Sequence, residues 1–249
     1  MNRYEYMGIR NGFRIPVWAA QVAVRNKWSS HFNWNSNYRM VQNMVRGIIT
    51  SGNVCVNIYG KENLPKRDSY LICSNHQGFF DGLALILAME KPFRLVVMKE
   101  MKDFRFVRYV LRLLDPIYLD RSDLRDAFRM IGTCNEELQN GRNVLIFPEG
   151  TLEKQENTLL PYKAGALKAA YMAKAPIVPV VLKNSFAPFE KSGCKKCNVE
   201  VHILEPLLYE DYNKKKTKET ADRIMKISAE VLQEPQLSPH RLKFQPFQA

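Results

Sequence analysis

At residues 71–81 the chain passes from an apolar run, Leu71-Ile72-Cys73-Ser74, into the polar block Asn75-His76-Gln77-Gly78-Phe79-Phe80-Asp81. The apolar run reads as a buried strand, and Asp81 opens an apolar helix. Because ligands of α/β sheets bind beyond the carboxyl ends of strands, His76 is placed to face a site. A turn through Gln77 and Gly78 would let the Asp81 carboxylate reach one imidazole nitrogen, fixing the tautomer and stabilising the imidazolium.

The second imidazole nitrogen of His76 would then be free to take a proton from a hydroxyl group. No serine or cysteine nucleophile is placed with His76 and Asp81, so the pattern favours a base that activates a hydroxyl of the substrate itself. Taken alone, this spacing recurs by chance, and a structural histidine at a strand end is the alternative interpretation.

From residue 53 onward, strand-like and helix-like runs alternate without an internal repeat. The alternation predicts an α/β domain with a central, largely parallel or mixed sheet flanked by helices. A chain of 249 residues is long enough for one such domain with a full core. The predicted strands are 54–59, 70–74, 94–98, 117–119, 144–147, 177–182 and 199–204, and the predicted helices are 81–90, 104–114, 122–140, 163–174 and 217–233.

A second block, Phe147-Pro148-Glu149-Gly150-Thr151, leaves the predicted strand 144–147 as a tight turn. Gly150 permits close approach of the backbone to a ligand, and free amides in such a turn can receive an anion. Between the two blocks, Arg121 follows strand 117–119, where a guanidinium suits bidentate phosphate binding. An ordinary turn and a surface ion pair are the alternative interpretations of these two features.

The basic residues are unevenly distributed. Lys and Arg number 37 against 25 Asp and Glu, which gives a formal net charge of +12. Residues 1–50 hold seven basic residues, one acid and all three tryptophans. Such a segment is typical of a membrane–water interface, and nucleic acid is the rival partner for a basic protein.

Within this segment, residues 12–28 predict a helix, and Ser36 is expected to cap a second helix. The apolar part of the first helix is about ten residues, too short to span a bilayer that needs roughly 20. We therefore divide the chain into a membrane-associating segment, residues 1–49, and an α/β domain, residues 50–249. Packing of both helices on the core is the alternative. The first helix carries an apolar stripe formed by Phe13, Val17, Ala20, Val24 and Trp28.

Five cysteines and the lack of a cleavable signal peptide fit a reducing compartment. Cys194 and Cys197 form a lone C-x-x-C, to which His202 could add a third ligand, whereas a structural zinc site normally needs four. A turn after Gly193 explains the pair without a metal. We predict no bound metal and no resident cofactor.

Together the motifs resemble the glycerolipid acyltransferase family, most closely the bacterial 1-acylglycerol-3-phosphate acyltransferases. The resemblance runs in family order over about residues 54–205, and the basic N-terminus is similar to the membrane-docking element of bacterial members. His76 and Asp81 match the N-H-x4-D motif, Phe147 to Thr151 match F-P-E-G-T, Tyr118-Leu119-Asp120-Arg121 match the arginine block, and Val178-Pro179-Val180-Val181-Leu182 match the late V-P-V strand.

The chain departs from the family pattern at two positions. Asp115 stands where a glycine usually opens the arginine block, and Leu152 stands where an arginine often follows F-P-E-G-T. Lys163 matches a basic position that the family often shows and would supply charge instead. These departures bear on the acceptor headgroup rather than on the reaction.

The resemblance implies transfer of a fatty acyl group from an acyl thioester to the free hydroxyl of 1-acylglycerol-3-phosphate, making phosphatidic acid for phospholipid synthesis. The thioester carrier would be acyl carrier protein or coenzyme A. His76 would be the base, oriented by Asp81, with direct attack and no acyl-enzyme. Arg121 and Lys163 would hold the phosphate, Glu149, Gly150 and Thr151 would shape the acceptor site, and amides near Gly78 or Gly150 would hold the oxyanion.

Two alternatives remain open. One is transfer to a different acceptor, such as glycerol-3-phosphate or another lysolipid. The other is a non-catalytic basic module that binds anionic lipid or nucleic acid. We expect a monotopic protein at the cytoplasmic face of a membrane, with a phospholipid surface and lysophosphatidic acid as partners and no nucleic acid.

Overall fold

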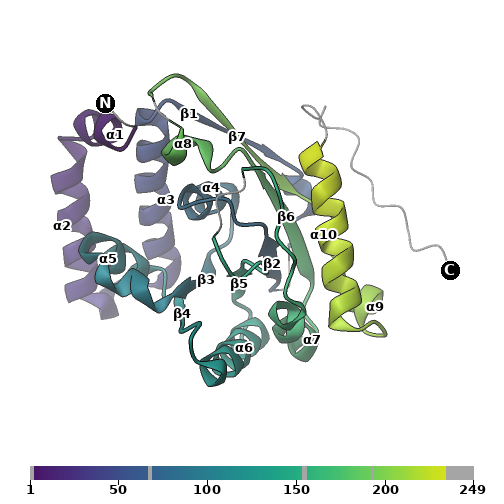
Figure 1. Cartoon of the computed structure of the whole chain (residues 1–249). Coiled ribbons are helices and arrows are strands. Elements are labelled where there is room, and N and C mark those ends of the chain that lie inside the picture. The colour runs from purple at the N-terminus through teal and green to yellow at the C-terminus, as the bar shows by residue number, and fades with distance from the viewer. Residues whose placement is uncertain (1–2, 67–68, 153–155, 192, 234–249) are drawn as a thin grey trace.

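The computed structural model describes residues 3–66, 69–152, 156–191 and 193–233. Within these residues, seven strands form one mixed sheet in the order β1-β7-β6-β2-β5-β3-β4 (Figure 1). The five strands from β6 to β4 run parallel, whereas β7 is antiparallel to β6 and parallel to β1. The strands are β1 (Val54–Tyr59), β2 (Leu71–Ser74), β3 (Phe93–Met98), β4 (Ile117–Leu119), β5 (Asn143–Ile146), β6 (Ile177–Lys183) and β7 (Cys197–Ile203). The predicted α/β fold with a mixed sheet is confirmed.

The five helices predicted after residue 50 are present, whereas two short helices, at residues 187–190 and 209–212, were not predicted. Residues 164–167 are an exception in type, because they form a 3-10 turn that precedes α7. The helices are α1 (Arg3–Arg10), α2 (Arg14–Lys27), α3 (Trp34–Ser51), α4 (Phe80–Ala88), α5 (Arg105–Leu113), α6 (Leu124–Gln139), α7 (Lys168–Ala173), α8 (Ala187–Glu190), α9 (Tyr209–Tyr212) and α10 (Thr217–Gln233).

Two details of the N-terminal region differ from the prediction. Helix α1 was not predicted, and it is fixed by the buried Arg3, which donates to the Gly52 carbonyl at 2.7 Å. The prediction of Ser36 as the cap of α3 is wrong. The helix begins earlier, and the Asn33 side chain accepts a hydrogen bond from the Ser36 amide. Asn is as good an N-cap as Ser, so the sequence allowed either start.

Both faces of the sheet are covered by helices, as the continuous apolar strands require. In β2, Leu71 and Cys73 pack with residues of α6, α7 and α10, whereas Ile72 lies on the other face with α3 and α4. The same alternation occurs in β5, where Val144 and Ile146 face one layer and Leu145 the other. The parallel strands therefore present only their carboxyl edge, and not a face, to a ligand.

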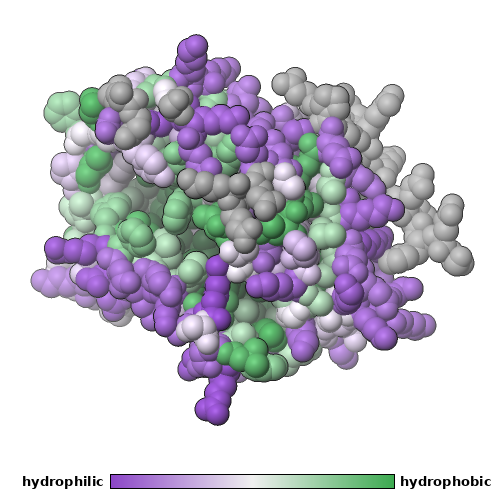
Figure 2. All heavy atoms as spheres, in the orientation of Figure 1, coloured by the Kyte–Doolittle hydropathy of each residue, from purple (hydrophilic) through white to green (hydrophobic). Residues whose placement is uncertain are grey.

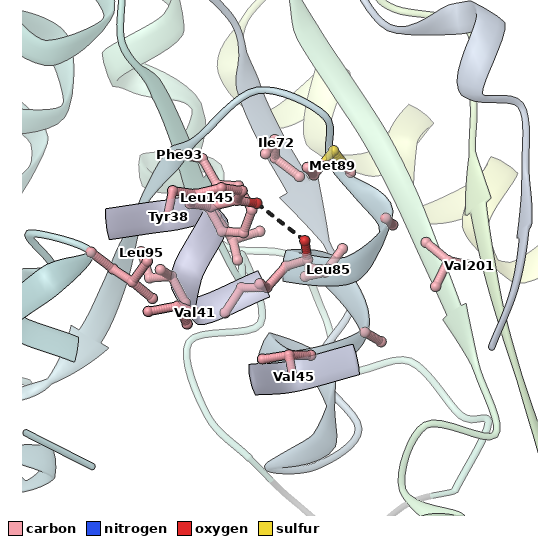
Figure 3. Close-up of a cluster of buried hydrophobic side chains, with 14 of the residues drawn as sticks. Tyr38, Val41, Val45, Ile72, Leu85, Met89, Phe93, Leu95, Leu145 and Val201 are labelled. Atoms are coloured by element: carbon pink, nitrogen blue, oxygen red, sulfur yellow. Dashed lines mark hydrogen bonds between the residues drawn. The ribbon is translucent and has the colours of Figure 1, made fainter. Parts of the chain in front are cut away.

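Helix α3 belongs to the core rather than to the surface. Tyr38, Val41 and Val45 point toward α4 and the sheet, where Leu85 and Phe93 are fully buried (Figure 3). The Tyr38 hydroxyl donates to the Ile86 carbonyl at 3.3 Å. Helix α3 therefore packs on the core, which was the alternative interpretation for both N-terminal helices.

Helix α2 differs from α3. All five residues of its predicted stripe are exposed, with Phe13 98% and Val17 55% exposed, and the inward side holds the buried Val22. The part of the chain that the structure describes contains no helix with the length and apolarity needed to cross a bilayer. Helix α2 thus has an apolar face that no other described residue covers.

We expect Leu85→Ala to lower the free energy of unfolding by about 2–5 kcal/mol, because it opens a cavity in a fully buried cluster. Leu124→Ala is the control, since Leu124 is 74% exposed and its loss should change stability by about 0.5 kcal/mol or less. Urea denaturation measures both. Equal, small effects would contradict the assignment of α3 and α4 to the core.

Candidate active site

His76 and Asp81 meet on the turn between β2 and α4, at the carboxyl edge of the parallel strands. The His76 Nδ1 donates to Asp81 Oδ2 at 2.6 Å, since a carboxylate can only accept. Asp81 is fully buried, and the His76 side chain is 17% exposed. The Phe147 ring stacks on the imidazole with a centroid distance of 4.0 Å. The predicted contact is confirmed, and it leaves Nε2 without a hydrogen-bond partner among the described residues.

The Asp81 carboxylate accepts hydrogen bonds from four donors. Besides His76, the amides of Gln77 and Gly78 donate to Oδ2 at 2.6 and 3.0 Å, and the Ser185 hydroxyl donates to Oδ1 at 2.5 Å. A buried carboxylate is costly unless it is hydrogen-bonded in this way. The turn from residue 76 to 81 is therefore wrapped around the carboxylate that it carries.

The backbone amides of Gly78 and Gly150 themselves already donate hydrogen bonds within the protein. The Gly78 amide donates to Asp81, and the Gly150 amide donates to the Phe147 carbonyl at 3.1 Å. The prediction that amides near Gly78 or Gly150 hold the oxyanion would therefore need a neighbouring amide rather than either of these two. Both are consumed by the tight turns that place the motifs.

Ser185, which sequence reasoning missed, is a fully buried residue two positions after β6. The Ser185 hydroxyl can donate only one hydrogen bond. We assign this bond to Asp81, because hydrogen bonds to an ionised acceptor are stronger. The Ser185 amide donates to Gln77 Oε1 at 2.9 Å, and Gln77 Nε2 donates to Asn157 at 3.0 Å. Asn157 also accepts from the Asn184 amide at 2.8 Å. In the sequence, the feature that could have identified Ser185 as a site residue is its position just after the V-P-V strand.

Glu149 lies beside His76 and Asp81, three residues after the end of β5, the strand next to β2. It is 3% exposed, and its Oε1 accepts from the His76 amide at 3.3 Å. Burial raises the pKa of Glu149 to about 7, and the nearby Asp81 adds to this, whereas amide hydrogen bonds oppose it. Part of the Glu149 population is therefore neutral near pH 7.

The turn at Gly150 is held against Lys163. Gly150 has a φ of +68°, and a Cβ atom there would lie 2.7 Å from Lys163 Nζ, so the lysine passes directly over the glycine. The Lys163 amide donates to the Pro148 carbonyl at 2.8 Å, which fixes this approach. Thr151 is partly exposed next to the turn. The structure thus brings a cation to the second motif, as the match at Lys163 predicted.

Arg121 lies at the same edge of the sheet but farther away. It follows β4, which is three strands from β2, or about 14 Å at ordinary strand spacing. Its side chain is exposed, and partial desolvation lowers the pKa of its guanidinium while Glu100 opposes this. His76, Asp81, Glu149, Gly150 and Lys163 form one group, and β3 and β5 lie between Arg121 and β2, the strand that precedes His76.

The departure at Asp115 has a clear backbone reason. Asp115 has a φ of +52°, a left-handed conformation that glycine adopts freely and that aspartate tolerates better than most residues. Its carboxylate pairs with Arg94 at 3.0 Å and lies 3.6 Å from Arg142. The usual glycine is thus replaced by a residue that keeps the turn.

Residues 55–183 match the Acyltransferase family. This chain belongs to that family. The 1-acyl-sn-glycerol-3-phosphate acyltransferase of Saccharomyces cerevisiae is 33% identical over 196 residues, covering 74% of this chain and 62% of that protein. The protein of the same name from Helicobacter pylori is 30% identical over 172 residues, covering 63% of this chain and 73% of that protein. The chain therefore spans about three fifths of the yeast protein's length.

A solved structure supports the fold. The crystal structure of the 1-acyl-sn-glycerophosphate (LPA) acyltransferase PlsC from Thermotoga maritima superposes with a TM-score of 0.73 at 19% identity, covering 96% of this chain and 100% of that chain. The single α/β domain with a mixed sheet is thus shared with that acyltransferase.

We expect Glu149→Gln to remove a pH dependence of stability. Because burial raises the pKa of Glu149 from 4.5 to about 7, the folded state holds this proton more tightly than the unfolded chain. Wild-type stability should therefore fall, relative to Glu149→Gln, by up to about 3 kcal/mol as the pH rises from about 4.5 to 7. Urea denaturation at several pH values measures this. Parallel pH profiles for the two proteins would contradict it.

Proposed function

We propose that this protein transfers a fatty acyl group from an acyl thioester directly to the free hydroxyl of 1-acylglycerol-3-phosphate. One observation carries the proposal: a buried carboxylate holds Nδ1 of His76, and Nε2 is left available at the carboxyl edge of the sheet. Membership of the Acyltransferase family and the names of the relatives support 1-acylglycerol-3-phosphate as the acceptor.

In the proposed reaction, His76 Nε2 takes the proton of the acceptor hydroxyl while its oxygen attacks the thioester carbonyl. An oxygen–carbon bond forms, the carbon–sulfur bond breaks, and the thiolate leaves with the proton returned by the imidazolium. Asp81 orients the imidazole and stabilises its positive charge. General-base catalysis of this kind contributes about 10²–10⁴ in rate.

Ser185 is a positioning residue in this scheme, because it touches Asp81 rather than the substrate. Its bond to Oδ1 and the two amide bonds to Oδ2 hold the carboxylate from opposite sides. The Asp81 carboxylate can then turn neither toward solvent nor away from His76. Gln77 and Asn157 extend this support to the segment that follows the second motif.

The acceptor phosphate would lie between Lys163 and Arg121. Lys163 Nζ sits at the Gly150 turn, and Arg121 follows the edge strand β4. An ionised Glu149 beside a phosphate would repel it. A pKa of about 7 reduces this repulsion, and Glu149 then shapes the site through its bond to the His76 amide. The acyl carrier would be acyl carrier protein or coenzyme A.

Thiol release from an acyl thioester in mixed micelles tests the reaction, with lysophosphatidic acid or glycerol-3-phosphate as acceptor. We expect release that requires lysophosphatidic acid and that His76→Ala abolishes. His31→Ala is the control, since His31 is an exposed histidine outside the site.

Other outcomes would assign a different function. Faster release with glycerol-3-phosphate would support the alternative acceptor. Release without acceptor would indicate a thioesterase, and no release with any lysolipid would favour the non-catalytic module.

Monotopic membrane association is the second part of the proposal, and the exposed face of α2 supports it. Next to α2 lies α5, joined to it by a hydrogen bond from Asn26 Nδ2 to the Tyr109 carbonyl at 3.1 Å. Figure 2 shows a hydrophobic hollow beside these helices, with hydrophilic residues along the side where α5 lies. Exposed residues of α5 and its entry include Phe104, Phe106 and Tyr109 together with Arg105, Arg108 and Arg112.

Phe13→Asp and Val17→Asp should each weaken binding to phospholipid vesicles, because burial of such side chains contributes about 1.5–3 kcal/mol, roughly tenfold or more in affinity. Met172→Asp is the control, since Met172 is 55% exposed on α7. Co-sedimentation measures the binding. Deleting residues 1–49 is not a clean test, because it also removes α3 from the core. Unchanged sedimentation of both α2 variants would contradict docking through α2.

A further inference from the structure

A polar groove of about 660 Å³ lies between α2 and α3, and none of its lining residues belongs to the group around His76. The volume is within the range of roughly 300–1,000 Å³ that small-molecule sites occupy. Three asparagines, a glutamine and a serine contribute polar groups, Arg25 and Arg39 contribute charge, and Trp18, Met40 and Met44 form the apolar part of the lining. The described lining contains no acidic residue, so the groove suits an anion.

Arg25 is held in place by neutral partners. Its Nη1 donates to Ser36 Oγ at 3.0 Å and to Asn37 Oδ1 at 2.9 Å, and its guanidinium lies 4.4 Å from the centroid of the Phe32 ring. No described carboxylate is within ion-pair distance of it. Both hydrogens of Nη1 are used in these bonds, and Nε and Nη2 have no hydrogen-bond partner among the described residues, so this edge of the guanidinium can bind an anion in a fork geometry.

Arg39 adds a second positive charge to the same groove. It is exposed on α3, and it forms no ion pair with any residue that the structure describes. Glu5, on α1, is the single acidic residue in the described stretch 3–52. The two arginines are therefore not neutralised by the helices that carry them, and a phosphate is the group that pairs best with two guanidinium forks.

A second groove, of about 450 Å³ and mainly apolar, adjoins the polar one, because Gln21 and Arg25 line both. Its other lining residues are Val17, Ala20, Val24 and Phe32, three of which belong to the exposed stripe of α2. A phosphate alone would occupy only the polar groove. The pair of grooves fits a ligand with an anionic head and an apolar chain.

We propose that the two grooves together bind one anionic glycerophospholipid, with its phosphate on Arg25 and Arg39 and an acyl chain along Val17, Ala20 and Val24. This lipid is not the acceptor, because the grooves share no residue with the proposed acceptor site. The site would hold α2 at a fixed depth, with the phosphate level of the leaflet at the polar groove. Membrane binding would therefore depend on headgroup recognition as well as on apolar insertion.

Vesicle co-sedimentation tests the proposal, with phosphatidylcholine alone and with phosphatidylcholine mixed with phosphatidylglycerol. Arg25→Lys keeps the charge but removes the guanidinium fork. We expect it to weaken binding to the mixed vesicles about tenfold, the size of one lost charge-assisted hydrogen bond, and to change binding to phosphatidylcholine far less, because the choline cation neutralises the phosphate of that lipid. Thermal unfolding and the phosphatidylcholine binding show whether the variant is folded.

Arg10→Ala is the matched control, since it removes one exposed N-terminal charge outside the groove. It should weaken binding to the mixed vesicles by about fivefold or less, as expected for a charge near the surface. If Arg25→Lys binds like wild type while Arg10→Ala and Arg25→Ala lose affinity equally, diffuse charge alone acts and the proposed site is wrong.

A competition experiment separates a lipid from a free phosphate or a protein. Short-chain phosphatidylglycerol should displace the protein from mixed vesicles far better than soluble glycerol-3-phosphate. Equal competition by glycerol-3-phosphate would overturn the role of the apolar groove. If Arg25→Lys no longer bound an acidic protein partner but still bound lipid vesicles like wild type, the proposal that the grooves bind a lipid would be wrong. Neither experiment requires turnover, so a failed transferase assay leaves both results interpretable.

Discussion

The buried carboxylate of Asp81 is the group on which the site depends. A charge with no exposure is tolerated only when donors surround it, and here the donors come from three sources: the His76 ring, the turn at Gln77 and Gly78, and Ser185 beyond β6. Satisfying this one carboxylate therefore fixes the turn after β2, the exit of β6 and the orientation of the imidazole together.

The sheet makes this convergence available. Because β6, β2 and β5 are adjacent and parallel, their carboxyl ends deliver Ser185, His76 and Glu149 to one edge. Helices cover both faces, so the edge is where polar groups can face a substrate. The same geometry keeps Arg121 apart from this group, because Arg121 follows β4, the outermost strand, three strands from β2.

Much of the fold and of the site could be predicted from periodicity and motif order, including the seven strands and the contact of His76 with Asp81. Ser185 could not, because its contact depends on β6 lying beside β2, and strand order is not a local property. The sequence also did not show whether α2 and α3 pack on the core or remain exposed, because both helices carry apolar stripes. Only the packing in the structure shows that Tyr38 is buried and Phe13 is exposed. The use of the Gly78 and Gly150 amides within their own turns was likewise hidden, because spacing does not show which donors are free.

The role of Asp81 is tested most directly by the rate of acyl transfer by Asp81→Asn, compared with wild type and His76→Ala at saturating lysophosphatidic acid. The amide keeps the size of the carboxylate but cannot stabilise an imidazolium. We predict that kcat falls by about 10²–10⁴ while KM for the acceptor stays close to that of wild type. Transfer by Asp81→Asn at the wild-type rate would contradict the claim that this buried carboxylate makes His76 a base.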